Sequence, residues 1–168
     1  MNPANAIAAS ALTLIGKPEG LRALDQIQKD SADDTLLNFD VIPSSKAAFE
    51  VHAGNGAKAV ELLARSKMYE PGPASLPGIY VRGMAYLQTR SGVEAAGEFQ
   101  KIIDNRGVAP MSELYPLANL GLGRAYAMSG DPAKARKAYQ DFLELWKEAD
   151  PDIPILVQVK KEYQRLAQ

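Results

Sequence analysis

The chain has 168 residues, 46% hydrophobic and 23% charged, which is the composition of an ordered globular protein and excludes an intrinsically disordered one. Its 19 basic and 20 acidic residues leave a net charge of -1, so no general attraction to nucleic acid or to an anionic membrane surface is expected. The lack of cysteine excludes disulfides and thiolate chemistry and leaves the localisation open between cytoplasm and periplasm.

The first expected element is an apolar helix over residues 4–15, which carries no charged side chain. This stretch is too short to cross a bilayer and lacks the basic residues that precede a signal-peptide core, so no membrane insertion is expected. Gly16-Lys17-Pro18 then separates it from a second helix, which gives a first helix pair over residues 3–31. The uncharged first helix is also a candidate surface for self-association.

Three further helix pairs follow, over residues 33–67, 74–105 and 112–148. In each, a helical pattern ends at a small or polar cluster, and an Ala-rich helix comes next. The clusters are Gly54-Asn55-Gly56, Ser91-Gly92 and Gly130-Asp131-Pro132. Glycine suits the end of a helix because it tolerates positive φ, and Asp131 or Ser91 suits the N-cap of the next helix, where Glu94 would complete a capping box with Ser91.

The pairs align on one position of the second helix, at steps of 38, 36 and 40 residues, occupied by Leu21, Ala59, Ala95 and Ala135. Twelve residues upstream of these positions lie Ala9, Ala47, Gly83 and Gly123. Small side chains at both places let the two helices of a pair approach closely, and we expect neighbouring aromatic side chains to fill the remaining space. These aromatic residues are Tyr86, Phe99, Tyr126 and Tyr139.

The last expected element is a single amphipathic helix over residues 154–167, after a helix-breaking Asp150-Pro151-Asp152-Ile153-Pro154 sequence. Its apolar face would cover the end of the fourth pair and consists of Ile155, Leu156, Val159, Tyr163 and Leu166. Its polar face, expected in water, consists of Lys160, Lys161, Glu162 and Arg165.

The pattern of small and aromatic residues in the third and fourth pairs resembles the tetratricopeptide motif, whose period is about 34 residues. This resemblance implies an all-α, right-handed superhelix of about four helix pairs plus a C-terminal capping helix, in one domain over residues 1–168. Such repeats are binding scaffolds, so the expected partner is a protein or peptide.

Residues 45–168 also resemble the C-terminal tetratricopeptide array of some bacterial, notably acidobacterial, serine/threonine protein kinases and related signalling proteins. The residues that carry this resemblance are the run from Tyr80 to Leu87 and the run from Leu117 to Pro154. It implies a docking or sensor module beside an output domain. No kinase motif is present in this sequence, so the resemblance implies no phosphoryl transfer.

No pattern of catalytic, metal-binding or cofactor-binding residues is expected. The lone His52 is interpreted as an ordinary helix residue, and the pairs Asp33-Asp34 and Asp150/Asp152 as caps and connections. Gly121-Leu122-Gly123 opens like a dinucleotide fingerprint, but it lies in a predicted helix with no strand before it. The chain is therefore not expected to be an enzyme.

The resemblance places one face of the first helices on a concave groove. The tentative groove residues are Tyr80, Met84, Gln88, Leu120, Arg124 and Met128, with Ser44 and Ala48 from the second pair. Some tetratricopeptide domains hold a terminal carboxylate with cationic side chains. Here the matching places are uncharged: Ser44, Ser45, Ala48, Pro77 and Val81. We expect a protein-interaction scaffold, with self-association and small-ligand sensing as alternatives.

Overall fold

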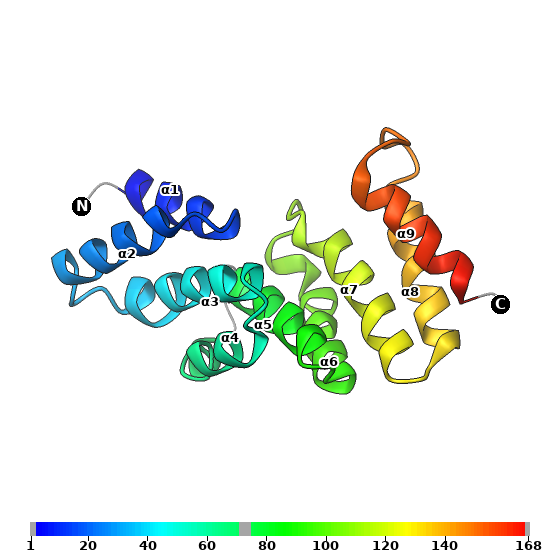
Figure 1. Ribbon diagram of the computed structural model, residues 1–168, viewed down its shortest axis with the longest axis horizontal. Helices are drawn as coiled ribbons and strands as arrows, with labels where there is room; N and C mark the ends of the chain where they lie inside the picture. Colours follow the sequence, from blue (N-terminus) through cyan, green and yellow to red (C-terminus); the bar gives the residue numbers. More distant parts are fainter. Residues whose placement is uncertain (1–2, 71–74, 167–168) are drawn as a thin grey trace. The chain divides into compact units, whose positions relative to one another are not determined.

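The computed structural model describes residues 3–70 and 75–166, and all regular structure within these ranges is helical (Figure 1). The prediction of an all-α chain is thereby confirmed for the described residues. Positions 74 and 167, expected to begin the third pair and to end the last helix, lie outside them, as do positions 1, 2 and 168 of the expected domain. The chain divides into two compact units, residues 1–89 and 90–168, where the sequence analysis expects one repeat domain.

The first unit is a succession of short helices that pack on their neighbours. They are α1 (Pro3–Leu14), α2 (Pro18–Asp30), the π-helix η1 (Leu37–Val41), α3 (Ile42–His52), α4 (Gly56–Leu62), the 3-10 helix η2 (Ser66–Tyr69) and α5 (Leu76–Gln88). Helix α1 packs against α2 and α3, and α3 packs against α4 and α5. Ala47 and Ala59, the expected small pair, are fully buried in one cluster with Leu63 and Val81.

The second unit contains four α-helices in its described part. They are α6 (Gly92–Asp104), α7 (Leu114–Met128), α8 (Pro132–Leu145) and α9 (Pro154–Arg165), with a 3-10 turn η4 (Arg106–Val108) after α6. Helix α7 packs against α6 and α8, and α9 packs against α8. Phe142 of α8 is fully buried and stacks on Trp146 with ring centroids 5.1 Å apart.

Two residues after the first helix of each expected pair, the backbone takes the left-handed conformation. The residues at these positions are Gly16, Gly54, Arg90 and Gly130, with φ values of 71°, 83°, 59° and 78°. Each lies five residues before the aligned second-helix position, so the backbone repeats with the spacing found in the sequence. In the third pair Arg90 takes the left-handed conformation, and Gly92 is the first residue of α6, directly after the expected N-cap Ser91.

Gly92 is needed for close helix packing. A Cβ atom on Gly92 would lie 2.9 Å from the carbonyl oxygen of Ala125 in α7. Gly56 at the start of α4 has the same role, since a Cβ there would lie 2.7 Å from the carbonyl oxygen of Ala85 in α5. The first residue of α4 thus contacts the backbone of α5, and the first residue of α6 contacts the backbone of α7.

The expected N-caps are only partly formed. Asp131 caps α8, because its carboxylate accepts a hydrogen bond of 3.0 Å from the backbone N–H of Lys134. Asp34 acts similarly at the start of η1, where its carboxylate accepts a 2.9 Å bond from the N–H of Leu37. Ser91 is the N-cap of α6, but its side chain makes no capping hydrogen bond, so the expected capping box with Glu94 is absent.

Candidate binding surfaces

Three of the six tentative groove residues lie on α5, in the first unit. Tyr80 and Met84 are half-buried, and Gln88 is exposed. The Gln88 side-chain amide donates a 2.7 Å hydrogen bond to the carbonyl oxygen of Val51 at the end of α3. Gln88 therefore has a structural role, since it fastens the C-terminal ends of α3 and α5 together.

The other three tentative residues lie on α7, in the second unit. Leu120 is only 2% exposed and belongs to the core, so its side chain does not line a surface groove. Arg124 forms two hydrogen bonds, each of 3.0 Å, to the carboxylate of Glu162 in α9. Met128 is 40% exposed. The expectation that Glu162 faces water is thus wrong, because Arg124 holds its carboxylate against α7.

The uncharged residues at the positions of a carboxylate clamp do come together in the first unit. They line a cavity of about 190 Å³ together with three residues of α1 and η1. The lining residues are Ser10, Leu14, Val41, Ser44, Ser45, Ala48, Pro77 and Val81. No cationic side chain lines this cavity, so it offers no charge to a peptide carboxylate.

A larger apolar cavity of about 460 Å³ continues from the first one, and Ser10, Leu14 and Val41 line both. Its lining residues are Ala6, Ile7, Ser10, Ala11, Leu14, Asp34, Leu36, Leu37 and Val41. We call the two cavities together the first-unit groove. Ile7 and Leu14 on α1 are 71% and 60% exposed, so the rim of this groove presents large aliphatic side chains to solvent.

Helix η1 shapes one wall of the groove. It is a π-helix, a rare element in which one extra residue widens the turn and which often marks functional sites. Next to it, the Ser45 hydroxyl of α3 lies 2.7 Å from the Ser10 hydroxyl of α1 and 2.8 Å from the carbonyl oxygen of Val41 in η1, within hydrogen-bond distance of both. The wider turn places Val41 at the groove and Asp40 in the interior.

Asp40 is a buried carboxyl group that the sequence analysis did not consider. Burial raises its pKa above the usual value, the neighbouring Ser44 hydroxyl opposes this shift, and the negative charge of Glu70 adds to it. A Cβ atom on Gly78 of α5 would lie 3.6 Å from the Asp40 carboxylate and 2.6 Å from the Ser44 hydroxyl. Gly78 thus gives the two polar groups the space they occupy between α3 and α5.

Comparison with protein-family models, with curated protein sequences and with solved structures finds no match.

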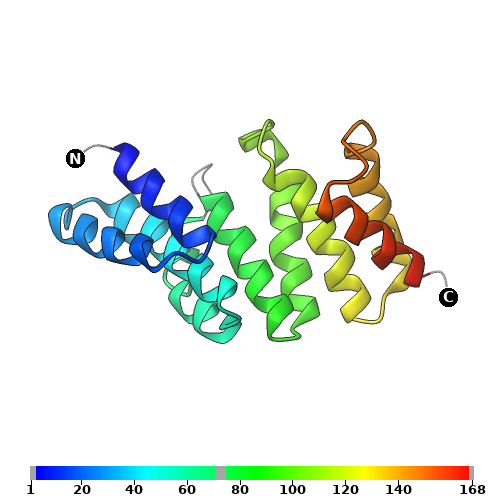
Figure 2. The same cartoon turned by 45° about the horizontal axis from the view of Figure 1, so that its top comes forward.

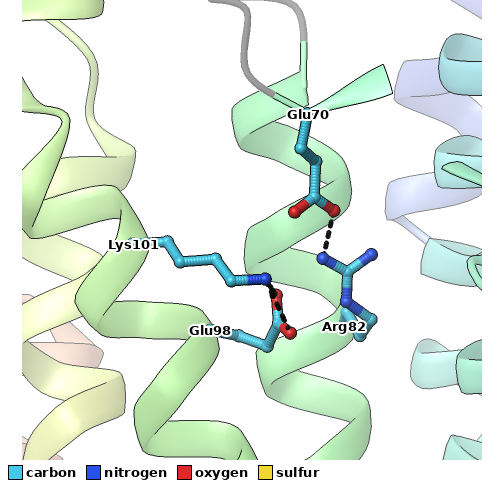
Figure 3. A network of polar contacts seen from close by, with 4 residues as sticks. All are labelled: Glu70, Arg82, Glu98 and Lys101. Carbon is cyan, nitrogen blue, oxygen red and sulfur yellow. Dashed lines mark hydrogen bonds and ion pairs between the residues drawn. The ribbon is translucent and has the colours of Figure 1, made fainter. Parts of the chain in front are cut away.

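Arg82 is a second buried charge that hydrophobic patterning did not reveal. Its side chain is fully buried and forms an ion pair with Glu70, at the end of η2 (Figure 3). A buried arginine needs an acidic partner of this kind because its guanidinium does not lose its charge in a protein. A separate ion pair lies in α6, where Lys101 pairs with Glu98 at 3.2 Å, one helical turn apart.

His52, the lone histidine, has a packing role. His52 is the exposed last residue of α3, and its ring lies over Gly16, where a Cβ atom would come within 2.2 Å. In the described ranges, no group of three or more His, Asp or Glu side chains is placed to hold a metal ion. A search of the same ranges for a helix with the length and hydropathy of a membrane span finds none.

Proposed function

We propose that this chain is a tetratricopeptide-like protein-interaction module whose first unit binds a peptide segment of a partner protein in the first-unit groove. The observation that carries this proposal is the continuous aliphatic groove between α1, η1, α3 and the start of α5. Two of its lining residues, Ser44 and Ala48, lie where the resemblance to tetratricopeptide repeats puts the ligand-facing side of the first helices. The recurring left-handed turns support the same superhelical repeat.

The groove favours a peptide with aliphatic side chains and a basic residue at one end. Asp34 is a charged residue that lines the groove. Asp30 and Asp33 lie close to it in the sequence and make this segment acidic. A lysine or arginine of the peptide would be attracted to this end of the groove. Burying one aliphatic side chain such as Leu14 gains about 1.5–3 kcal/mol, which exceeds the ~1.4 kcal/mol of a ten-fold change in affinity.

The test is selection from a random peptide library displayed on phage, followed by affinity measurements on the selected peptides. We expect these peptides to be rich in aliphatic residues with a flanking lysine or arginine. Replacing both Ile7 and Leu14 by Gln should weaken their binding more than ten-fold, because the rim loses its aliphatic contacts. Both positions are exposed, so circular dichroism should show an unchanged fold.

The matched control is Val93→Gln, at an aliphatic residue of α6 that is 74% exposed and lies in the second unit. This variant should bind the selected peptides like the parent chain. Equal affinity of the double variant, or an equal loss in the control, would refute the assignment of the groove. Self-association through α1 would involve the same exposed Ile7 and Leu14, and it would appear as a concentration-dependent mass in sedimentation equilibrium.

A further inference from the structure

The smaller cavity of the first-unit groove, of about 190 Å³, forms one end of the groove, and we call it the inner cavity. It lies among α1, α3 and α5, where α3 packs against both of the other helices (Figure 2). Ala48 and Val81 line it and are buried, so its walls reach the core of the first unit. An apolar cavity of about 150 Å³ is large enough to bind benzene. The inner cavity therefore has room for one side chain of the size of leucine or phenylalanine.

The hydroxyl groups of the inner cavity are engaged or buried within the chain. The Ser10 hydroxyl donates a 2.9 Å hydrogen bond to the carbonyl oxygen of Ala6. The Ser45 hydroxyl lies within hydrogen-bond distance of Ser10 and of a backbone carbonyl oxygen. The Ser44 hydroxyl oxygen is buried beside the Asp40 carboxyl. A polar side chain would lose its water here without gaining a comparable partner, whereas an apolar side chain gains by leaving water.

The acidic end of the groove lies at a defined distance from the inner cavity. Asp34 lines the larger cavity but not the inner one, and it directly precedes a helical stretch that continues without a break over residues 35–52. Ser44 of this stretch lines the inner cavity, ten residues after Asp34. At a rise of about 1.5 Å per residue these positions are roughly 15 Å apart along the helix. An extended peptide, at about 3.3 Å per residue, covers this distance with about four to five residues.

We propose that the inner cavity anchors one leucine or phenylalanine side chain of a peptide that lies extended along η1 and α3, with a lysine or arginine about four to five residues away at Asp34. This inference rests on the proposed function, since it names the side chain and the spacing that the first-unit groove selects. Ile7 and Leu14 form an open rim, which selects hydrophobic residues without selecting their size. The inner cavity is bounded by buried residues and selects both.

The first test probes the inner cavity alone, with toluene as the ligand and no peptide present. We expect toluene to bind the parent chain saturably and to shift the NMR signals of the amides around Ala48 and Val81. Ala48→Leu fills the cavity and should weaken toluene binding more than ten-fold. The matched control is Ala11→Leu, which adds the same atoms at an exposed residue of the larger cavity and should leave these shifts as in the parent.

The second test uses the parent chain and the peptides selected from the phage library. We expect a leucine or phenylalanine about four to five residues from a lysine or arginine. Replacing this apolar residue by Ala or Asn should weaken binding more than ten-fold, and moving the basic residue by about three positions should remove its contribution. A spacing of about ten residues would mean that the peptide binds as a helix, which would overturn the proposed arrangement.

The two tests separate failure of the anchoring cavity from failure of the proposed function. Peptides that bind while toluene leaves the amides around Ala48 and Val81 unchanged would overturn the anchoring cavity and leave the proposed function standing. Toluene binding without any selected peptide would refute the proposed function and the peptide anchor with it. Circular dichroism checks the fold of Ala48→Leu. If this variant does not fold, the measurements on the parent chain decide by themselves.

Discussion

Arg90 occupies a backbone conformation that glycine adopts at the three equivalent turns. Its φ of 59° places its Cβ against the following carbonyl group, at a cost of about 1–2 kcal/mol. Glycine avoids this cost but loses about 0.5–1 kcal/mol through its greater freedom in the unfolded chain. The residue at this turn therefore affects stability through the backbone conformation and not through side-chain packing.

We expect Arg90→Gly to raise the free energy of unfolding by up to about 1 kcal/mol, because the relieved strain exceeds the entropic loss. The measurement is chemical denaturation followed by circular dichroism. Gly54→Ala is the matched control: no atom lies within 4 Å of the new Cβ, yet φ is 83°, so this variant should be less stable by about 1–2 kcal/mol. Destabilisation by Arg90→Gly would contradict the strain at this turn.

Because of Glu162, the free energy of unfolding should decrease when the pH falls into the acidic range. Its pKa in the folded state is lower than its usual value of 4.5, so its ionised form stabilises the folded state at neutral pH. This contribution is fully present above the pKa that Glu162 has in the unfolded chain. It is lost as the pH falls through the lower pKa that Glu162 has in the folded chain. We expect Glu162→Gln to reduce the free energy of unfolding by about 1–3 kcal/mol at pH 7, since it removes hydrogen bonds to a charged group.

The difference between Glu162→Gln and the parent chain should shrink as the pH falls below 4.5, because the carboxyl of the unfolded parent chain then becomes protonated before that of the folded chain. Denaturant titrations of both chains between pH 3 and pH 7, on the order of one pH unit apart, measure this difference. A difference that stays constant over this range would show that the Arg124 pair does not hold the carboxylate in its ionised form.

At the scale of single helices, the two glycines of α6 provide a matched pair. Gly92→Ala would bring a Cβ within 2.9 Å of the Ala125 carbonyl oxygen of α7, so we expect a loss of about 1–3 kcal/mol from forced separation of the helices. Gly97→Ala meets nothing within 4 Å and should gain about 0.5–1 kcal/mol from better helix propensity. Thermal unfolding of the two variants checks both signs. Equal effects would show that the contact of α6 with α7 is looser than described.

Helix pairs, turns and the last helix could be predicted from the sequence because each leaves a local pattern. Gly54 and Gly130 mark turns, and Asp131 marks an N-cap, by their own backbone preferences. The left-handed Arg90 and the close contact at Gly92 were not predicted, because arginine rarely adopts positive φ and because a glycine near a turn does not reveal which helix it contacts. Helix periodicity distinguishes an apolar from a polar face, but in the uncharged α1 it does not show which apolar side chains remain exposed to solvent.

At the scale of the whole molecule, the residues that were not predicted are those that depend on distant partners. Arg124 was expected on the groove and Glu162 in water, because the two residues are 38 positions apart and no local pattern connects them. Leu120 is buried for the same reason, since α9 returns to cover it. The tentative groove residues therefore divide: Ser44 and Ala48 line the first-unit groove, whereas Leu120 and Arg124 pack against α9.

The connection from Trp146 to Ile153 holds α9 close to the face of α8 that it covers. Short tethers of this kind give effective concentrations in the millimolar range. A separate helix of the same sequence at about 1 μM would occupy this face about a thousand times less often than α9 does. The covalent connection therefore keeps the apolar cluster of the second unit covered, and lengthening it would weaken this effect.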